Sequence, residues 1–206
     1  MNIIAINMDN IILGIYKNME RILNKKGYSF DIGDMKTFDF NQSLSDEYYI
    51  TLGTPLSEIY TLLHTPELYK TASYDWDIIT LIRRYAEWKM QFIIYADRVS
   101  DGVFMAKQAL FSKWFGYMPN IKFKPFSEDD KLKLNRYKVS VIVDSECKYM
   151  SDCSLSVQKN LVDKQYNREV YNTKFAAVFG QESFNRYDSA EDAIRAAVRF
   201  VELQSI

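Results

Sequence analysis

Acidic and amide side chains follow three short apolar runs of this sequence. The runs, each with the polar residues after it, are Ile3–Ile6 with Asn7 and Asp9, Phe92–Tyr95 with Asp97, and Val139–Val143 with Asp144. Carboxylates and amides gathered at one place bind divalent cations or transfer protons. The chemistry to look for is therefore metal-assisted or acid–base chemistry, provided that the fold brings these ends together.

The elements that position these residues follow from the pattern of apolar residues. Unbroken runs rich in β-branched residues are typical of strands buried on both faces of a parallel sheet. Two further strands are expected at Ile121–Phe123 and Phe175–Phe179, and helical patterns lie near 78–86, 99–116 and 190–204. Strands that alternate with helices predict an α/β fold with a doubly wound parallel sheet. Ligands of such sheets bind beyond the carboxyl ends of the strands, where the polar residues stand.

Residues 15–75 interrupt this alternation. Helix-like pieces are expected near 15–26, 43–51 and 55–64, separated by turn signals and without a convincing buried strand. Roughly 60 residues are too many for a simple crossover between strands. We therefore expect a small helical cap at 15–75, inserted after the first strand, and a core made of 1–14 and 76–206.

Composition excludes several classes of protein. The chain has 26 Lys and Arg against 27 Asp and Glu, which gives no general attraction to nucleic acid or anionic membranes. The basic stretch at 122–138 is interrupted by acidic residues and indicates a solvated loop. Two cysteines and one histidine rule out a Cys/His zinc cluster and a disulfide framework. No apolar stretch is long enough to span a membrane, and we expect a cytoplasmic protein.

The order of these motifs resembles the haloacid dehalogenase (HAD) superfamily of phosphatases, and most closely its 5′(3′)-deoxyribonucleotidase branch. That branch begins with a motif like DMDGVLAD, which corresponds here to residues 7–14. Its GY and TxWDL elements are similar to 27–28 and 37–40, and its late xQPYN element is similar to residues 179–186. The partial matches extend over nearly the whole chain.

The departures from the family lie at the catalytic positions. The resemblance places the attacking, Mg²⁺-binding aspartate at Asn7, and an amide is a poor nucleophile that brings no charge to a metal. Asp9 corresponds to the general acid and base. Tyr95 stands where the family has a phosphate-binding Ser or Thr, and its ring is expected to fill the phosphate site. The final acidic pair retains only Asp144.

The lysine that neutralises the phosphate in this family has no clean counterpart. Lys131, Lys133 and Lys138 are the candidates, and their spacing does not choose between them. Only Asp9 and Asp144 remain as metal ligands, which predicts a weak Mg²⁺ site or none. Each lost catalytic group costs about 10²- to 10³-fold in rate, so we expect no cofactor and a protein without phosphatase activity.

Each surviving residue also has a structural interpretation. Asp9 and Asp144 are relics of catalysis or, equally, residues that cap turns at strand ends. Asn7 is expected to form a hydrogen bond with Asp144 in place of a metal bridge. The aromatic residues near the cap either form its core or a contact surface, because aromatic side chains serve both purposes. They are Tyr48, Tyr49, Tyr60, Tyr69, Tyr74 and Trp76.

Three hypotheses follow for the function. The first is a catalytically degenerate relative of the nucleotidases that binds a protein partner, by analogy a phage-type inhibitor of a host defence or toxin protein. The second is a Mg²⁺-dependent phosphatase of deoxynucleoside monophosphates that uses Asp9 and Asp144. The third is a protein that binds nucleotides without hydrolysing them.

Overall fold

The computed structural model describes residues 2–32, 56–126, 137–145, 150, 154, 156–164, 167 and 184–204. Its centre is a six-stranded sheet in which all strands run parallel. The strands are β1 (Ile3–Asn7), β2 (Gln91–Asp97), β3 (Ile121–Phe126), β4 (Val139–Asp144), β5 (Gln158–Val162) and β6 (Asn185–Tyr187). The helices are α1 (Ile15–Lys25), α3 (Leu56–Leu63), α4 (Pro66–Lys70), α5 (Trp76–Glu87), α6 (Asp101–Phe115) and α8 (Ala190–Leu203). The predicted α/β class is confirmed.

The strand order is β3-β2-β1-β4-β5-β6, so the chain moves outward from β1 in one direction and then returns to build the other half. This reversal between β1 and β4 is the doubly wound arrangement that the sequence predicts. It is also the topological switch point, where α/β sheets bind their ligands. In the register of the sheet, Asn7 pairs with Tyr95 and Ile6 with Val143. The polar ends of β1, β2 and β4 therefore meet at the switch point.

Three strands of the sheet match the expected apolar runs, and the expected strand near residue 121 is also present. β5 and β6 were not predicted. β5 begins with three polar residues. The buried amide of Asn160 donates a hydrogen bond of 2.9 Å through Nδ2 to the carbonyl of Ala193 and accepts one of 2.9 Å through Oδ1 from Gln158 Nε2. The expected strand at Phe175–Phe179 and the expected helix at 43–51 lie outside the described residues.

The two faces of the sheet carry separate apolar clusters. One face packs against α5, α6 and α8 through side chains such as Ile4, Ile94 and Val143. The other face carries a smaller cluster that includes Ile93, Tyr95 and Leu161. Tyr95 thus projects from the face opposite these three helices, which determines what its hydroxyl group meets.

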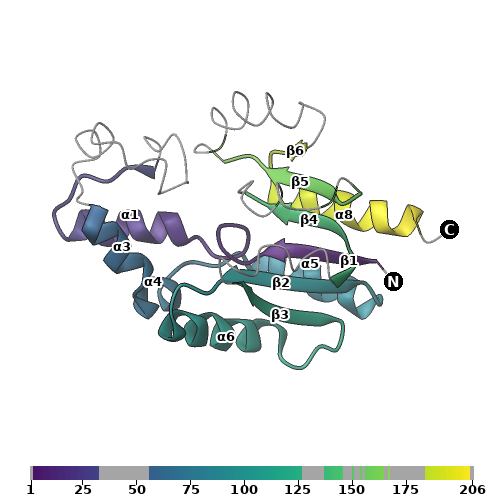
Figure 1. The fold of residues 1–206 in the computed structure, drawn as a ribbon, viewed down its shortest axis with the longest axis horizontal. Helices are drawn as coiled ribbons and strands as arrows, with labels where there is room; N and C mark the ends of the chain where they lie inside the picture. Colours follow the sequence, from purple (N-terminus) through teal and green to yellow (C-terminus); the bar gives the residue numbers. More distant parts are fainter. Residues whose placement is uncertain are drawn as a thin grey trace.

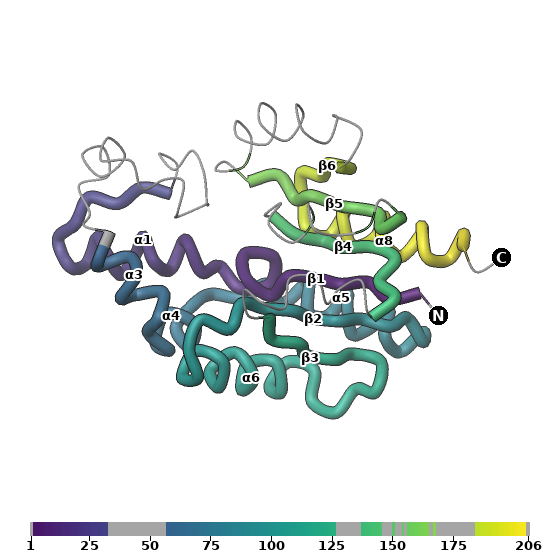
Figure 2. The backbone as a smooth tube through the Cα atoms, viewed as in Figure 1, coloured from purple at the N-terminus to yellow at the C-terminus, as the bar shows by residue number. Residues whose placement is uncertain are grey.

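Helices α1, α3 and α4 lie beyond the carboxyl ends of β1 and β2 (Figure 1). Their buried side chains, including Met19 and Leu68, belong to the same apolar cluster as the helix-covered face of the sheet. The chain makes a tight loop between β1 and α1 (Figure 2). A Cβ atom on Gly14 would lie 2.8 Å from Ser73 Oγ, so the start and the end of the 15–75 segment are in close contact. That this segment is a separate cap stays a prediction.

Helix starts agree with the sequence. Ser189 Oγ accepts a hydrogen bond of 3.0 Å from the backbone N–H of Asp192 and caps α8, at the start of the helix expected near 190–204. Ser100 caps α6 in the same way, and the Asp75 carboxylate caps α5. Among the described residues, no helix is both long and apolar enough to cross a lipid bilayer.

Candidate functional site

The side chain of Asn7 connects the ends of β1 and β4. Its Nδ2 donates a hydrogen bond of 2.9 Å to Asp144 Oδ1, and its Oδ1 accepts one of 2.9 Å from the backbone N–H of Asp9. Turning the amide round would place a donor against a donor and an oxygen against a carboxylate, so only this orientation is favourable. Asn7 is 4% exposed and Asp144 is fully buried. The hydrogen bond that the sequence predicts between them is confirmed.

Tyr95 provides the second hydrogen bond to Asp144. Its hydroxyl group donates to Asp144 Oδ2 at 2.5 Å, and the backbone N–H of Ser145 donates to Oδ1 at 2.7 Å. The tyrosine ring is completely buried and packs edge-on against Phe126. Both oxygens of the Asp144 carboxylate therefore accept hydrogen bonds from neutral donors, and such hydrogen bonds stabilise a buried carboxylate.

Lys107, on α6, brings a buried cation to the same edge of the sheet. Its Nζ lies 2.5 Å from Asp9 Oδ2 and 2.9 Å from the carbonyl oxygen of Asp97, and 4.5 Å from the centre of the Tyr69 ring. The lysine side chain is only 1% exposed. Sequence reasoning did not find this residue. A signal was present, because Lys107 follows Val103 by one helical turn within the buried stripe of α6.

Opposing electrostatic effects act on the pKa of the Asp9 carboxyl group. Burial raises the pKa of its carboxyl group above the ordinary value of 3.8, Lys107 works against this increase, and the negative charge of Asp97 adds to it. The second oxygen, Oδ1, is buried and has no hydrogen-bond partner among the described residues. Asp9 is therefore placed as the partner of a buried ammonium group, and its side chain is 14% exposed.

As the described part of the chain arranges them, these side chains do not fit a magnesium ion. Mg²⁺ requires near-octahedral oxygen ligands at short distances. Here Asn7 Oδ1 accepts from a backbone N–H, both Asp144 oxygens accept hydrogen bonds, and Asp9 pairs with an ammonium group. In the described part of the chain, no group of three or more acidic, His or Cys side chains is arranged to hold a metal.

The other candidate residues predicted from the sequence differ in their location and in their exposure. Lys138 is exposed and precedes β4, so it lies at the amino edge of the sheet, away from Asp9 and Asp144. Tyr69 is 2% exposed and contributes to the core beneath Lys107, which excludes it from a contact surface. Tyr60 is half-buried. Four others lie outside the described residues, namely Lys131, Lys133, Tyr48 and Tyr49.

Tyr74 and Trp76 are the two predicted contact residues that are exposed, at 39% and 52%. Their rings meet edge to face with centres 5.7 Å apart. Tyr74 also packs against Trp114, and Lys113 Nζ lies 5.4 Å from the centre of its ring. The two aromatic residues and Lys113 form one exposed cluster at the start of α5, which we call the α5 aromatic cluster.

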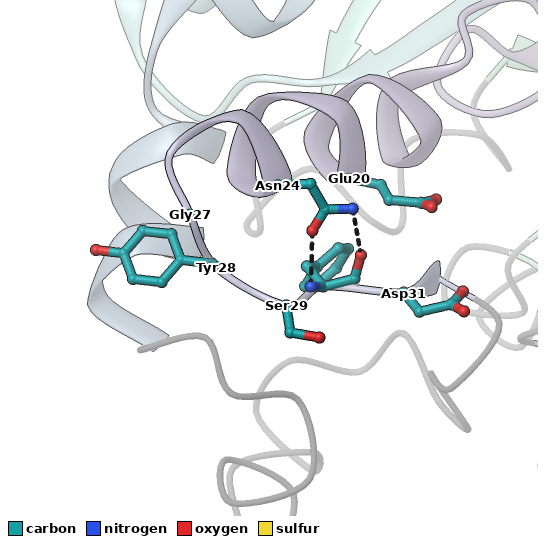
Figure 3. Close-up of a pocket in the computed structure, with 7 residues that line it drawn as sticks. Glu20, Asn24, Gly27, Tyr28, Ser29 and Asp31 are labelled. Carbon is teal, nitrogen blue, oxygen red and sulfur yellow. Dashed lines mark hydrogen bonds between the residues drawn. The ribbon is translucent and has the colours of Figure 1, made fainter.

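An open pocket of about 480 Å³ lies at the end of α1 (Figure 3). Asn24 forms two hydrogen bonds with the backbone of Phe30 across it, at 2.8 and 2.9 Å. The lining includes the Gly27-Tyr28 pair of the family resemblance and the acidic residues Glu20 and Asp31. None of the residues around Asp144 or Lys107 lines it, so this pocket and the buried network are separate features.

The sequence matches no family model, and no curated protein matches it either. Among solved structures, the chain is similar to D,D-heptose 1.7-bisphosphate phosphatase from B. bronchiseptica in complex with magnesium and phosphate. The identity is 12%, the TM-score 0.45, and each chain is covered to 100%. It is also similar to a haloacid dehalogenase-like family hydrolase from Xanthomonas campestris, with 11% identity, a TM-score of 0.44 and 96% of each chain covered. With scores this low, neither similarity supports a statement about the family or the activity of this chain.

Replacing Tyr95 by Phe tests the hydrogen bonds around Asp144. The variant keeps the ring but leaves a buried carboxylate oxygen without its donor, which should lower the free energy of unfolding by about 1–3 kcal/mol. Urea denaturation measures the change. Tyr117→Phe is the matched control, because Tyr117 is fully exposed and its hydroxyl group is in water. Equal stability of the two variants would show that the Tyr95 hydroxyl group contributes nothing.

The raised pKa of Asp9 makes a prediction about pH. A carboxyl group whose pKa is higher in the folded state than its ordinary 3.8 contributes most stability below that value, and the contribution falls as pH rises through the folded pKa. The advantage in unfolding free energy of the wild type over Asp9→Asn should therefore shrink as the pH is raised from below 3.8 towards neutral. Urea unfolding of both proteins across this range measures it. An advantage that grows with pH would mean that Lys107 outweighs burial.

Proposed function

We propose that this protein has a HAD-type fold without phosphatase chemistry and that it acts by binding a protein partner. The main support for the absence of phosphatase chemistry is the hydrogen-bond network of Asn7, Tyr95 and Asp144. An amide stands at the attacking position of the resemblance, and the surviving carboxylate accepts hydrogen bonds from neutral donors at both oxygens. This arrangement supports a site that is closed to a phosphoryl group and to a metal.

The ion pair between Asp9 and Lys107 supports the same conclusion. A general acid must reach the leaving group and exchange its proton with it. One oxygen of Asp9 is 2.5 Å from the Lys107 ammonium group, and the other is buried. The carboxyl group at the position of the family's acid and base is thus engaged in a structural ion pair.

The α5 aromatic cluster supports the proposed binding of a protein partner. Tyr and Trp are prominent among the residues that dominate protein interfaces. Their backbone is fixed here, because Tyr74 forms a β-bridge with Leu13 and the Asp75 side chain caps α5. A rigid surface loses little conformational entropy on binding. Inhibition of a host defence or toxin protein by a phage-type protein is one role of this kind, and it rests on analogy alone.

The absence of phosphatase activity is tested by phosphate release. Purified protein is incubated with Mg²⁺ and a panel of deoxynucleoside monophosphates, with Asp9→Ala as the background control. We expect wild type and Asp9→Ala to release phosphate equally. Asn7→Asp should not restore turnover, because Tyr95 and Lys107 still engage Asp144 and Asp9. Release by the wild type about 10²-fold or more above the control would establish the nucleotidase hypothesis instead.

A thermal-shift measurement in the same panel separates the nucleotide-binding hypothesis. A nucleotide at about 100 times its dissociation constant would stabilise the protein by about 2.7 kcal/mol. Stabilisation without phosphate release would replace the proposed function with nucleotide binding.

The binding surface is tested by substitution at α5. Trp76→Ala should abolish capture of the partner from the native host, measured by affinity purification with tagged protein. Trp88→Ala is the matched control, since Trp88 is 65% exposed at the opposite end of the same helix. Capture that survives Trp76→Ala, or that is lost equally in both variants, would contradict a contact through the α5 aromatic cluster.

A further inference from the structure

Lys107 lies where three parts of the molecule meet. The lysine belongs to α6, its ion-pair partner Asp9 follows β1, and the ring beneath its ammonium group, Tyr69, belongs to α4. We propose that Lys107 holds α4 in place over the carboxyl ends of β1 and β2 and that this contact excludes water from this edge of the sheet.

The chemistry of the ammonium group explains why this contact holds α4 in place. Two acceptors, the Asp9 carboxylate and the carbonyl oxygen of Asp97, lie on the side of the sheet, and the Tyr69 ring lies 4.5 Å away. A cation over an aromatic face gains most when water is excluded. Moving α4 away would replace this ring with water and weaken the ion pair through screening.

The orientation of the Tyr69 ring is fixed from its far end. Its hydroxyl group donates a hydrogen bond of 2.9 Å to the carbonyl oxygen of Leu63, in α3. The hydroxyl group therefore has a partner apart from Lys107, and the ring meets the cation with its face. Substitution can therefore separate the hydrogen bond to Leu63 from the cation–π contact with Lys107, because phenylalanine retains the face of the aromatic ring and leucine does not.

Other contacts of α4 in the described part of the chain connect it to neighbouring helices. Asn18 of α1 donates to the carbonyl oxygen of Leu68 at 2.6 Å, and a Cβ atom on Gly102 of α6 would lie 3.0 Å from Pro66. Lys107 connects α4 to charged and polar groups at the strand ends, namely the Asp9 carboxylate and the carbonyl oxygen of Asp97. Its loss should loosen α4 while the sheet itself remains intact.

Hydrogen exchange measured by mass spectrometry in the full chain tests whether Lys107 holds α4 in place. In Lys107→Met, amides of residues 66–72 should exchange about tenfold faster, as expected for loss of a desolvated cation–π contact. Amides of β1 and β4 should keep their wild-type protection. Lys113→Met is the matched control, since Lys113 is on the same helix but exposed, and it should leave residues 66–72 unchanged.

Two further variants keep the test decisive. If Lys107→Met fails to fold because Asp9 is left buried without a partner, the double variant Asp9→Asn/Lys107→Met removes both charges and should show the same local acceleration. Tyr69→Leu should also accelerate exchange in residues 66–72, and by more than Tyr69→Phe, because Phe loses only the hydrogen bond to Leu63 and keeps the ring face. Unchanged exchange at 66–72 in the double variant, or equal acceleration in the strands, would overturn the proposal.

Discussion

A carboxylate buried at the end of a central strand must have its charge stabilised from within the fold, and this requirement governs the architecture around Asp144. Isolated ionised groups are very costly to remove from water. The amide of Asn7, the hydroxyl group of Tyr95 and the backbone N–H of Ser145 meet the requirement here. Two of these donors come from residues at the ends of β1 and β2, so the carboxylate joins three neighbouring strands at the switch point.

The same edge of the sheet carries a second carboxylate, Asp9, whose charge is balanced in a different way. Asp9 is paired with Lys107, and the pair is covered by Tyr69. Neutral hydrogen bonds stabilise one carboxylate, and a buried ammonium group balances the other. Together they account for Asp9 and Asp144, the two acids that the family resemblance assigns to catalysis, which supports the proposal that the protein acts through its exposed surface.

The sequence was sufficient to predict the parts of this arrangement that depend on strand ends. Apolar runs predicted β1, β2 and β4, and parallel strands bring Asn7 and Asp144 together by geometry alone. The partner of the Tyr95 hydroxyl group depends on side-chain rotamers, which spacing does not contain. Lys107 was not predicted because the order of motifs in the family places a lysine near residues 131–138, whereas Lys107 belongs to the buried stripe of α6. β5 was missed because burial of its polar residues depends on partners distant in sequence, such as Ala193 for Asn160.

The outer strands of the described sheet have features that oppose aggregation. β3 carries Lys122 and Lys124, and Pro125 within it has no N–H to donate, while β6 is only three residues long. Charged residues, proline and short length are features that prevent foreign strands from adding to a sheet. Crowded copies of this molecule are thereby discouraged from stacking into fibrils along either border of the described sheet.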